Sequence, residues 1–223
     1  MKQHFIIRFV NACKKKLNYF SAFLVIVLPL IFSTQHSYTA DAAPPALNST
    51  KQNIALGKKY TCSPLPNYKF IKGEARNNPD DAVLLTDGKV SDIPDMHKDN
   101  KTAGWDGKAE VIIDFNLDKI YEFKYADIST CGNSSSGVRF PKEISILISL
   151  DKINYQIAGV LAEKDIDEII GKKIEKRKLR VSTPGAIALF VRFIIHNRTD
   201  TKGDTVAPYP RLFIDEINIW AEK

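Results

Sequence analysis

Apolar and polar residues alternate with a period of two along much of the chain after residue 50, which is typical of β-strands with one face on a core. The alternation is clearest in residues 111–117 and 144–149. Further strands are predicted at residues 121–130, 155–161, 179–182, 187–196 and 212–221. In the segment 187–196, apolar residues occupy both alternating rows, so we expect a central strand that is buried on both faces.

One segment departs from this alternation. In residues 163–176 the isoleucines recur near helical spacing, and acidic residues gather toward the start, where a helix favours them. Many short strands with one helix predict an antiparallel β-sandwich or barrel. The sequence therefore predicts an all-β fold with one short helical insertion near 163–176.

The first 42 residues resemble a targeting segment. Basic residues and no acidic ones occupy positions 1–16, an almost wholly apolar stretch follows at 17–32, and Ala40-Asp41-Ala42 fits an A-x-A cleavage site. The apolar stretch is short for a bilayer-spanning helix, which needs about 20 residues. We expect a signal peptide at 1–42, a flexible leader at 43–52 and a single domain at 53–223, with an uncleaved anchor as the alternative.

This organisation predicts an exported protein of the periplasm, cell surface or extracellular space, with no stable membrane span after cleavage. The net charge of +6 lies largely in the targeting segment. Residues 1–42 hold five of the 32 basic and one of the 26 acidic residues, so the remainder carries a net charge of +2. The basic run at 172–180 has the spacing of a solvated helix end rather than a phosphate-binding stripe. We therefore expect no nucleic-acid partner.

Two cysteines remain after the targeting segment, which contains Cys13. In an exported chain, Cys62 and Cys131 favour a disulfide. Two buried free thiols are the alternative, because the sequence does not give the separation of the two residues.

The motifs of common catalytic sites are absent from the sequence, including G-x-S-x-G, H-E-x-x-H, the phosphate loop and C-x-x-C. Several aspartates cluster between residues 80 and 95, where a pair could act as acid and base. Turn formation or calcium binding explains these aspartates without catalysis. We expect that the protein is not an enzyme.

The stretch Asn53-Ile-Ala-Leu-Gly-Lys-Lys-Tyr-Thr resembles the first strand of discoidin or coagulation factor 5/8 type C domains. Five further fragments match that family in the same order, at residues 85–88, 111–115, 140–151, 190–195 and 213–220. Residues 60–68, with Asp80-Asp81, are similar to modules of secreted bacterial proteins that often accompany polysaccharide-degrading enzymes. The resemblance covers 53–223 and implies a galactose-binding-like jelly-roll β-sandwich. The charged segment 162–178 departs from the family pattern.

The resemblance also implies a structural calcium ion beside the Asp-Gly turn. The matching residues are Asp87 and Glu216, and Asp92 lies close enough in sequence to contribute. Calcium binds six to eight oxygens, many of them backbone carbonyls. The alternative is that Asp87 only caps the turn and Glu216 is a solvated strand residue.

Ligands of this fold usually bind to loops at one end of the sandwich. A sugar site needs an aromatic plane and planar polar groups for the hydroxyls. The loop candidates of these types are His97, Trp105, Arg139, His196, Arg198, Tyr209 and Arg211. Structural roles are the alternative: Trp105 could close the core, Arg139 could form an internal salt bridge, and His196 could be satisfied within the fold.

Together these patterns predict an exported, non-catalytic module that recognises a carbohydrate at or outside the cell surface. The alternative is a protein–protein interaction, adhesion or surface-assembly module that uses the same loops. Its partner would then be another exported protein instead of a glycan.

Overall fold

The computed structural model describes residues 50–68, 70–71, 74–75, 83–133, 137–166, 173–198 and 211–222. The chain divides into two units, residues 1–46 and 47–223, and all described residues belong to the second. Every strand and core residue given below therefore lies within 47–223, so this part of the chain contains its own folding core.

The described residues of the second unit form strands and two single turns of 3-10 helix. The strands are β1 (Lys51–Asn53), β2 (Tyr60–Ser63), β3 (Phe70–Ile71), β4 (Glu74–Ala75), β5 (Ala103–Asp106), β6 (Glu110–Gly132), β7 (Glu143–Ser149), β8 (Gln156–Leu161), β9 (Glu175–His196) and β10 (Arg211–Glu222). The 3-10 turns are η2 (Met96–Lys98) and η3 (Glu163–Asp165).

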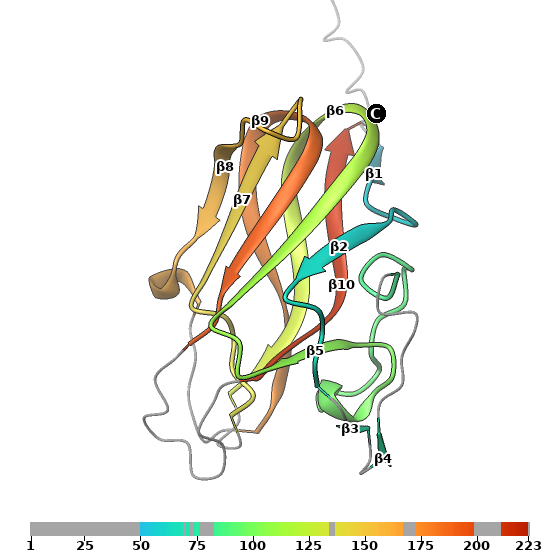
Figure 1. The fold of residues 1–223 in the computed structure, drawn as a ribbon, viewed down its shortest axis with the longest axis vertical. Helices are drawn as coiled ribbons and strands as arrows, with labels where there is room; N and C mark the ends of the chain where they lie inside the picture. The colour runs from blue at the N-terminus through green and yellow to red at the C-terminus, as the bar shows by residue number, and fades with distance from the viewer. Residues whose placement is uncertain are drawn as a thin grey trace, which may run out of the picture. The chain divides into compact units, whose positions relative to one another are not determined.

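Two long strands, β6 and β9, connect the two layers of the sandwich (Figure 1). They pair in antiparallel fashion from Glu110 opposite His196 to Gly132 opposite Glu175, and both bend in the middle. Positive φ angles mark the bends, 67° at Asp118 and 70° at Gly185. The sequence predicted four separate strands here, and the structure joins them into two.

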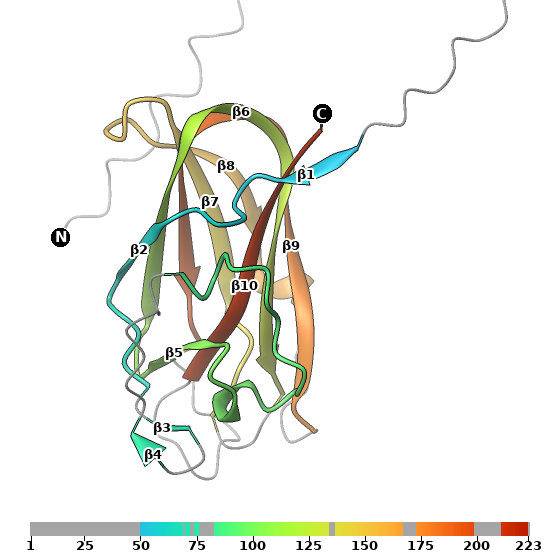
Figure 2. The ribbon, with the colours of Figure 1, turned by 90° about the vertical axis from the view of Figure 1, so that its right-hand side faces the viewer.

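Each half of β6 and β9 belongs to a different layer (Figures 1 and 2). The first layer contains β2, the first half of β6, the second half of β9, β7 and β8. The second layer contains the other halves of β6 and β9 with β10, which also pairs with β1 and β5. Strands β3 and β4 form a separate small pair.

The core lies between these layers and confirms the predicted alternation. Val111, Ile113 and Phe115 on β6 are buried, and Phe115 packs edge-on against Phe193 of β9 with ring centroids 5.6 Å apart. The central position predicted for 187–196 is confirmed, because β9 lies between β6 and β7 there. Burial on both faces is wrong: the outer row, which includes Phe190, remains partly exposed. The predicted all-β sandwich is confirmed by these strands.

In the segment predicted to be helical, residues 163–176, the structure describes one 3-10 turn at Glu163–Asp165 and the start of β9 at Glu175. Residues 167–172 lie outside the described part of the chain. The basic residues from Lys176 onward belong to β9 and not to a helix end. Across the parts of the chain that the structure describes, no helix is long and apolar enough to cross a membrane.

Candidate functional site

The lower end of the sandwich in Figure 1 holds four separate segments, and one side chain from each lies close to the others. Tyr68 lies between β2 and β3, His97 lies on η2, Asp106 ends β5 and Arg211 begins β10. We call these four residues the loop-end cluster. The bends of β6 and β9 lie at the opposite end of the same sandwich.

A buried ring, Phe213 of β10, holds the aromatic part of the cluster. Tyr68 packs edge-on against it with ring centroids 4.7 Å apart, and the His97 ring lies 6.0 Å away. Gly104 of β5 makes this packing possible: a Cβ there would lie 2.7 Å from Phe213 Cε1 and 2.8 Å from Tyr68 Cβ. The backbone N–H of Tyr68 donates to the Gly104 carbonyl at 3.0 Å. The ring of Tyr68 is therefore positioned by strand geometry.

Arg211 and Asp106 form the charged part of the cluster. They are directly opposite each other in the β5–β10 ladder, and Arg211 Nε lies 3.2 Å from Asp106 Oδ1. The Arg211 guanidinium carbon is 5.8 Å from the centre of the Tyr68 ring. The Asn67 side chain donates to the Asp106 carbonyl and accepts from its N–H, at 3.0 and 2.8 Å. A planar cation, a carboxylate and an aromatic ring thus share one partly exposed surface.

His97 adds a polar group that is half-buried. Burial lowers the pKa of its imidazole, with smaller contributions from Lys98 and Arg211, and Asp95 opposes the shift. The ring is therefore neutral at pH 7 and offers one donor and one acceptor nitrogen. Its Nδ1 is buried and has no hydrogen-bond partner.

The segment that carries His97 is fixed by an ion pair between the buried Asp215 and the partly exposed Lys176. Asp215 is the extra residue at a bulge in β10, and its Oδ2 lies 2.6 Å from Lys176 Nζ of β9. The same Asp215 oxygen accepts from the Ser91 N–H at 2.7 Å, and Lys176 donates to the Ser91 carbonyl at 2.7 Å. Thr102 closes the loop by donating to the Met96 carbonyl at 2.9 Å. The loop before β5 is thereby joined to both β9 and β10.

Three of the predicted ligand residues are buried, namely Trp105, Arg139 and Arg198. Trp105 has no exposed surface, and its Nε1 donates to the Pro64 carbonyl at 3.0 Å. Arg139 is also buried. Its neighbour Val138 forms an isolated β-bridge with Arg211, and the Arg139 N–H donates to the Arg211 carbonyl. The predicted surface roles of Trp105 and Arg139 are therefore wrong, since neither presents a face to a sugar.

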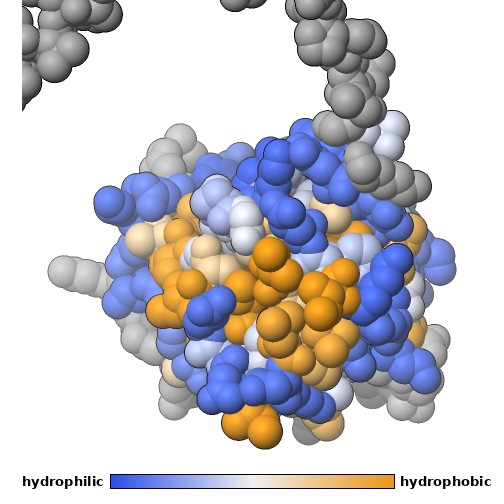
Figure 3. Space-filling model, turned by 90° about the horizontal axis from the view of Figure 1, so that it is seen from above, coloured by the Kyte–Doolittle hydropathy of each residue, from blue (hydrophilic) through white to orange (hydrophobic). Residues whose placement is uncertain are grey.

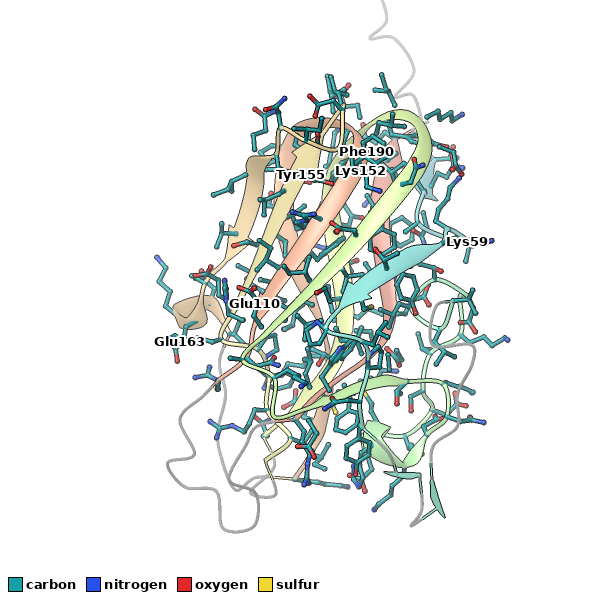
Figure 4. All side chains as sticks on the ribbon, in the orientation of Figure 1. Lys59, Glu110, Lys152, Tyr155, Glu163 and Phe190 are labelled. Carbon is teal, nitrogen blue, oxygen red and sulfur yellow. The ribbon has the colours of Figure 1, made fainter. Side chains whose placement is uncertain are left out.

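The other predicted ligand residues have separate positions. His196, at the end of β9, has its Nδ1 3.4 Å from Glu110 Oε2. Arg198 is buried and pairs with Glu163 of η3 at 2.5 Å, so it holds that turn in place. Figure 4 labels Glu110 and Glu163, the two acidic partners. Tyr209 lies outside the described residues.

The predicted metal residues fall into two groups. Asp92 is 82% exposed and pairs with Lys101 at 2.7 Å, and the Lys101 hydrogen bond lowers the pKa of its carboxyl. Asp87 accepts from the Lys89 N–H at 2.8 Å, as expected for a turn-capping aspartate. Glu216 is buried, which overturns the solvated alternative for this residue.

Glu216 has the properties of a cation ligand. Its Oε2 accepts from the Gly88 N–H at 3.3 Å, but its Oε1 is buried without a partner. Burial raises the pKa of Glu216 to about 8, and the nearby charges of Asp87 and Asp215 act in the same direction. A buried carboxylate oxygen that lacks a partner beside a second carboxylate fits a calcium ion.

The donor set for such an ion would consist of Glu216, Asp87 and further oxygens. No group of three His, Cys, Asp or Glu side chains suited to a metal occurs among the described residues. The remaining ligands would therefore have to be backbone carbonyls or water, which calcium accepts readily. Asp92 does not fit this set, because it is exposed and paired with Lys101.

Cys62 and Cys131 are not joined by a disulfide in this structure, in contrast to the predicted pairing. Cys62 lies on β2 opposite Ile113 and packs against the main core. Cys131 lies near the far end of β6, in a second cluster with Met96 and Phe213. The two thiols thus belong to different parts of the interior. Burial raises the pKa of Cys131 to about 12.

Comparisons with known proteins give matches to solved structures alone. No family model and no curated protein matches the chain. CpGH89CBM32-6 of Clostridium perfringens is 21% identical, with a TM-score of 0.39 over 76% of this chain and 99% of that one. Chitosan-binding module 1 of a Paenibacillus sp. IK-5 chitosanase/glucanase is 15% identical, with a TM-score of 0.44 over 75% and 98%.

A third match is the lectin domain of lectinolysin in complex with Lewis B antigen. It is 15% identical, with a TM-score of 0.46 over 77% of this chain and 98% of that one. The names of the second and third structures describe a chitosan-binding module and a lectin domain. At these identities and scores, the matches identify no ligand for this chain.

Sequence reasoning found half of the loop-end cluster. His97 and Arg211 were among the predicted loop candidates, whereas Tyr68 and Asp106 were missed. Tyr68 closes the fragment at 60–68 that carried part of the family resemblance, and this position was the available signal. Asp106 directly follows Trp105, and the tryptophan was the residue predicted to bind the ligand.

Proposed function

We propose that residues 53–223 form an exported, non-catalytic domain that binds a carbohydrate through the loop-end cluster. The observation that carries the proposal is the convergence of Tyr68, His97, Asp106 and Arg211 from four separate segments. The ring of Tyr68 offers an apolar plane to the C–H face of a sugar. Arg211 and Asp106 offer a planar donor and an acceptor to its hydroxyls.

The interior packing does not account for these polar groups. Asp106 and Arg211 are partly exposed, and the His97 Nδ1 has no hydrogen-bond partner although it is buried. Loops on a rigid scaffold are also the usual place for recognition.

We also propose a structural calcium ion at Glu216 and Asp87. When bound, calcium would supply the positive charge that the buried Glu216 carboxylate lacks. The carboxylate would thereby fix the turn at Gly88 against β10, through the hydrogen bond that already joins them. The ion would have no part in binding the sugar.

A glycan array with residues 43–223 tests the proposal, followed by titration of the strongest ligand. Replacing Arg211 by lysine keeps the charge but removes the planar fork. We expect affinity to fall by about fivefold to 150-fold, the effect of losing about 1–3 kcal/mol of charge-assisted hydrogen bonding.

The matched control is Arg192→Lys. Arg192 is similar in setting, since it pairs with Asp114 at 2.7 Å and stacks 4.3 Å from the Tyr155 ring, but it lies on the outer face of the first layer. The control should bind like the wild type. An array without any bound glycan, together with capture of a specific exported protein that Arg211→Lys abolishes, would support the interaction-module alternative. Release of reducing ends by the wild type would show that the domain is an enzyme.

A further inference from the structure

The outer face of the second layer carries charged and aromatic side chains that lie apart from the loop-end cluster. Arg180 of β9 is directly opposite Asp127 of β6, and Trp220 of β10 is directly opposite Tyr125 of β6. Lys51 of β1 lies over the Tyr125 ring, 5.5 Å from its centre. We call these five residues the face cluster. They come from four neighbouring strands of one sheet (Figure 2).

Alternation along the strands directs the face cluster outward. The core contains the residues next to its members on β6, β9 and β10, namely Ala126, Ile128, Leu179, Val181 and Ile219. Because successive side chains of a strand point to opposite faces, the cluster lies on the solvent side. Lys51 and Arg180 are accordingly exposed, and Tyr125 and Trp220 are partly exposed. Asp127 is the buried member, at 5%.

Asp127 holds the planar groups of the cluster in place. Its carboxylate accepts hydrogen bonds from Arg180 Nε at 2.7 Å, from Arg180 Nη2 at 3.0 Å and from Trp220 Nε1 at 3.0 Å. The Arg180 guanidinium carbon lies 3.9 Å from the centre of the Tyr125 ring. Arg180 Nη1 forms no hydrogen bond with a described residue. One edge of a fixed guanidinium thus remains available for a second carboxylate.

Two lysines on this face have no ion-pair partner among the residues that the structure describes. One is Lys51 of the face cluster. The other is the exposed Lys178, which lies two residues before Arg180 on the same side of β9. From Lys176 onward, the basic run that was predicted to end a helix therefore lies along a strand, where alternate side chains share one face.

The carboxylates near these lysines are already paired or buried. Glu222 pairs with Lys124 at 2.7 Å, and Glu175 pairs with Arg177 at 2.8 Å. Glu216 is buried, and burial raises its pKa to about 8, so without a cation it is largely uncharged at pH 7. The outer face of the second layer therefore carries a positive charge that its own acidic residues do not neutralise.

The bend end of the sandwich, where β6 and β9 bend, has a different surface. Figure 3 looks onto this end and shows hydrophobic side chains gathered in one area, with hydrophilic ones around them. Its exposed lysines, Lys119 and Lys152, have the acidic residues Glu122 and Asp151 near them in the sequence. The unneutralised positive charge is thus a property of the second layer's outer face.

We propose that the face cluster binds a carboxylate-bearing sugar, as a hexuronate unit of an acidic polysaccharide. Arg180 Nη1 and Nη2 donate to the sugar carboxylate, and Lys51 supplies a second positive charge. The rings of Trp220 and Tyr125 present apolar surface to the C–H groups of the pyranose. Lys178 attracts the carboxylate of a neighbouring unit.

This site is separate from the proposed carbohydrate site at the loop-end cluster. Arg211 and Trp220 lie nine residues apart on β10, which corresponds to about 30 Å along an extended strand. One terminal sugar does not reach both places. The two proposals therefore stand or fall independently.

Tryptophan fluorescence tests the proposal at the site itself. The chain has two tryptophans, and Trp105 is fully buried, so a ligand that contacts an indole ring has Trp220 available. Titration of residues 43–223 with oligogalacturonate should change the emission. The methyl-esterified oligomer, which lacks the charge, should bind at least about tenfold more weakly. In Trp220→Phe the fluorescence response should disappear, while calorimetry still detects binding.

Two substitutions separate the charge from the planar fork. Lys51→Gln should weaken binding of oligogalacturonate by about threefold to tenfold, and Arg180→Lys should weaken it by at least about fivefold. Each has a matched control elsewhere on the domain. Lys119 lies 4.9 Å from the centre of the Tyr121 ring, and Arg192 pairs with a carboxylate on the first layer. Lys119→Gln and Arg192→Lys should bind like the wild type.

Failure to bind oligogalacturonate at physiological salt, or equal affinity of Lys51→Gln and the wild type, would overturn the proposal. Equal binding of dextran sulfate, with no loss in Arg180→Lys, would replace it with unspecific attraction of polyanions. A loss in Arg211→Lys would move the acidic ligand to the loop-end cluster. Circular dichroism and thermal melting confirm the folding of each variant. Binding of the array glycan should be unchanged in Lys51→Gln, which distinguishes failure of one proposal from failure of the other.

Discussion

Glu216 of β10 accepts a hydrogen bond from the backbone N–H of Gly88, with Oε2 3.3 Å from the nitrogen, while its other carboxylate oxygen is buried without a partner. This contact joins the last strand to the turn at residues 85–88. Leu85 contributes a second link, because its carbonyl accepts from the Ile217 N–H at 2.7 Å. Two hydrogen bonds thus fix the turn to β10, through Glu216 and through its neighbour Ile217.

The first prediction concerns the pH dependence of stability without metal. Burial raises the pKa of Glu216 from 4.5 to about 8, so between these values the folded state keeps a proton that the unfolded state has released. The free energy of unfolding should therefore fall as pH rises from 5 to 8, by on the order of a few kcal/mol. Urea unfolding in chelator at several pH values measures this decline.

Calcium should remove that decline, because it stabilises the charged carboxylate of the native state alone. Glu216→Gln should abolish both the pH dependence and the response to calcium. Asp92→Asn, which alters an exposed residue, should leave both unchanged. Equal unfolding curves with calcium and with chelator at pH 8 would rule out a calcium site here.

The second prediction concerns Gly104. An alanine Cβ there would collide with Phe213 and Tyr68, so Gly104→Ala should cost about 1–3 kcal/mol of stability and displace the Tyr68 ring. Ligand affinity should fall as well. The comparison variant is Gly57→Ala, where a φ of 71° strains the backbone by about 1–2 kcal/mol but no atom lies within 4 Å of the new Cβ. Unchanged ligand affinity in Gly104→Ala would show that Tyr68 is not part of the binding site.

The third prediction concerns the thiols of Cys62 and Cys131. Burial raises the pKa of Cys131 to about 12, so its thiolate is scarce and the native protein should react with at most one equivalent of a thiol reagent. In denaturant without reductant, residues 43–223 should give two free thiols. A count of none after unfolding would establish a disulfide that the structure does not contain.

The fourth prediction is removal of residues 1–42 on export, motivated by the basic, apolar and A-x-A regions of the sequence. Mass spectrometry of the protein recovered from its producing cells should give an N-terminus at Ala43. An intact Met1 on a membrane-bound protein would favour the uncleaved anchor.

The strands were predictable because alternation is local, as in Val111, Ile113 and Phe115. The continuity of β6 and β9 was not predictable from local alternation. It depends on bends at Asp118 and Gly185, and the two strands remain paired with each other in both layers. At the C-terminal end of the segment 163–176, where the spacing predicts a helix, Glu175 and Lys176 belong to β9, and pairing with β6 decides their conformation.

The candidate site was only partly predictable, because the sequence gives the chemical type of a residue but not whether its side chain is buried. Trp105 has the right chemistry for a sugar, yet its place opposite Leu212 in the β5–β10 ladder puts it inside the core. Asp106 is joined to Arg211 by the pairing of β5 with β10, and Tyr68 is held beside them by its backbone hydrogen bond to Gly104. No local pattern reports that pairing.

The central claim is that a glycan binds at the loop-end cluster, and chemical-shift mapping tests it most directly. Labelled protein of residues 43–223 is titrated with the strongest glycan from the array while the backbone amides are followed by NMR. The account predicts that the largest shifts fall on Tyr68, His97, Asp106 and Arg211, with little change at Ile120 or Ile153. Shifts confined to the bend end, or to the outer sheet face around Arg192, would contradict it.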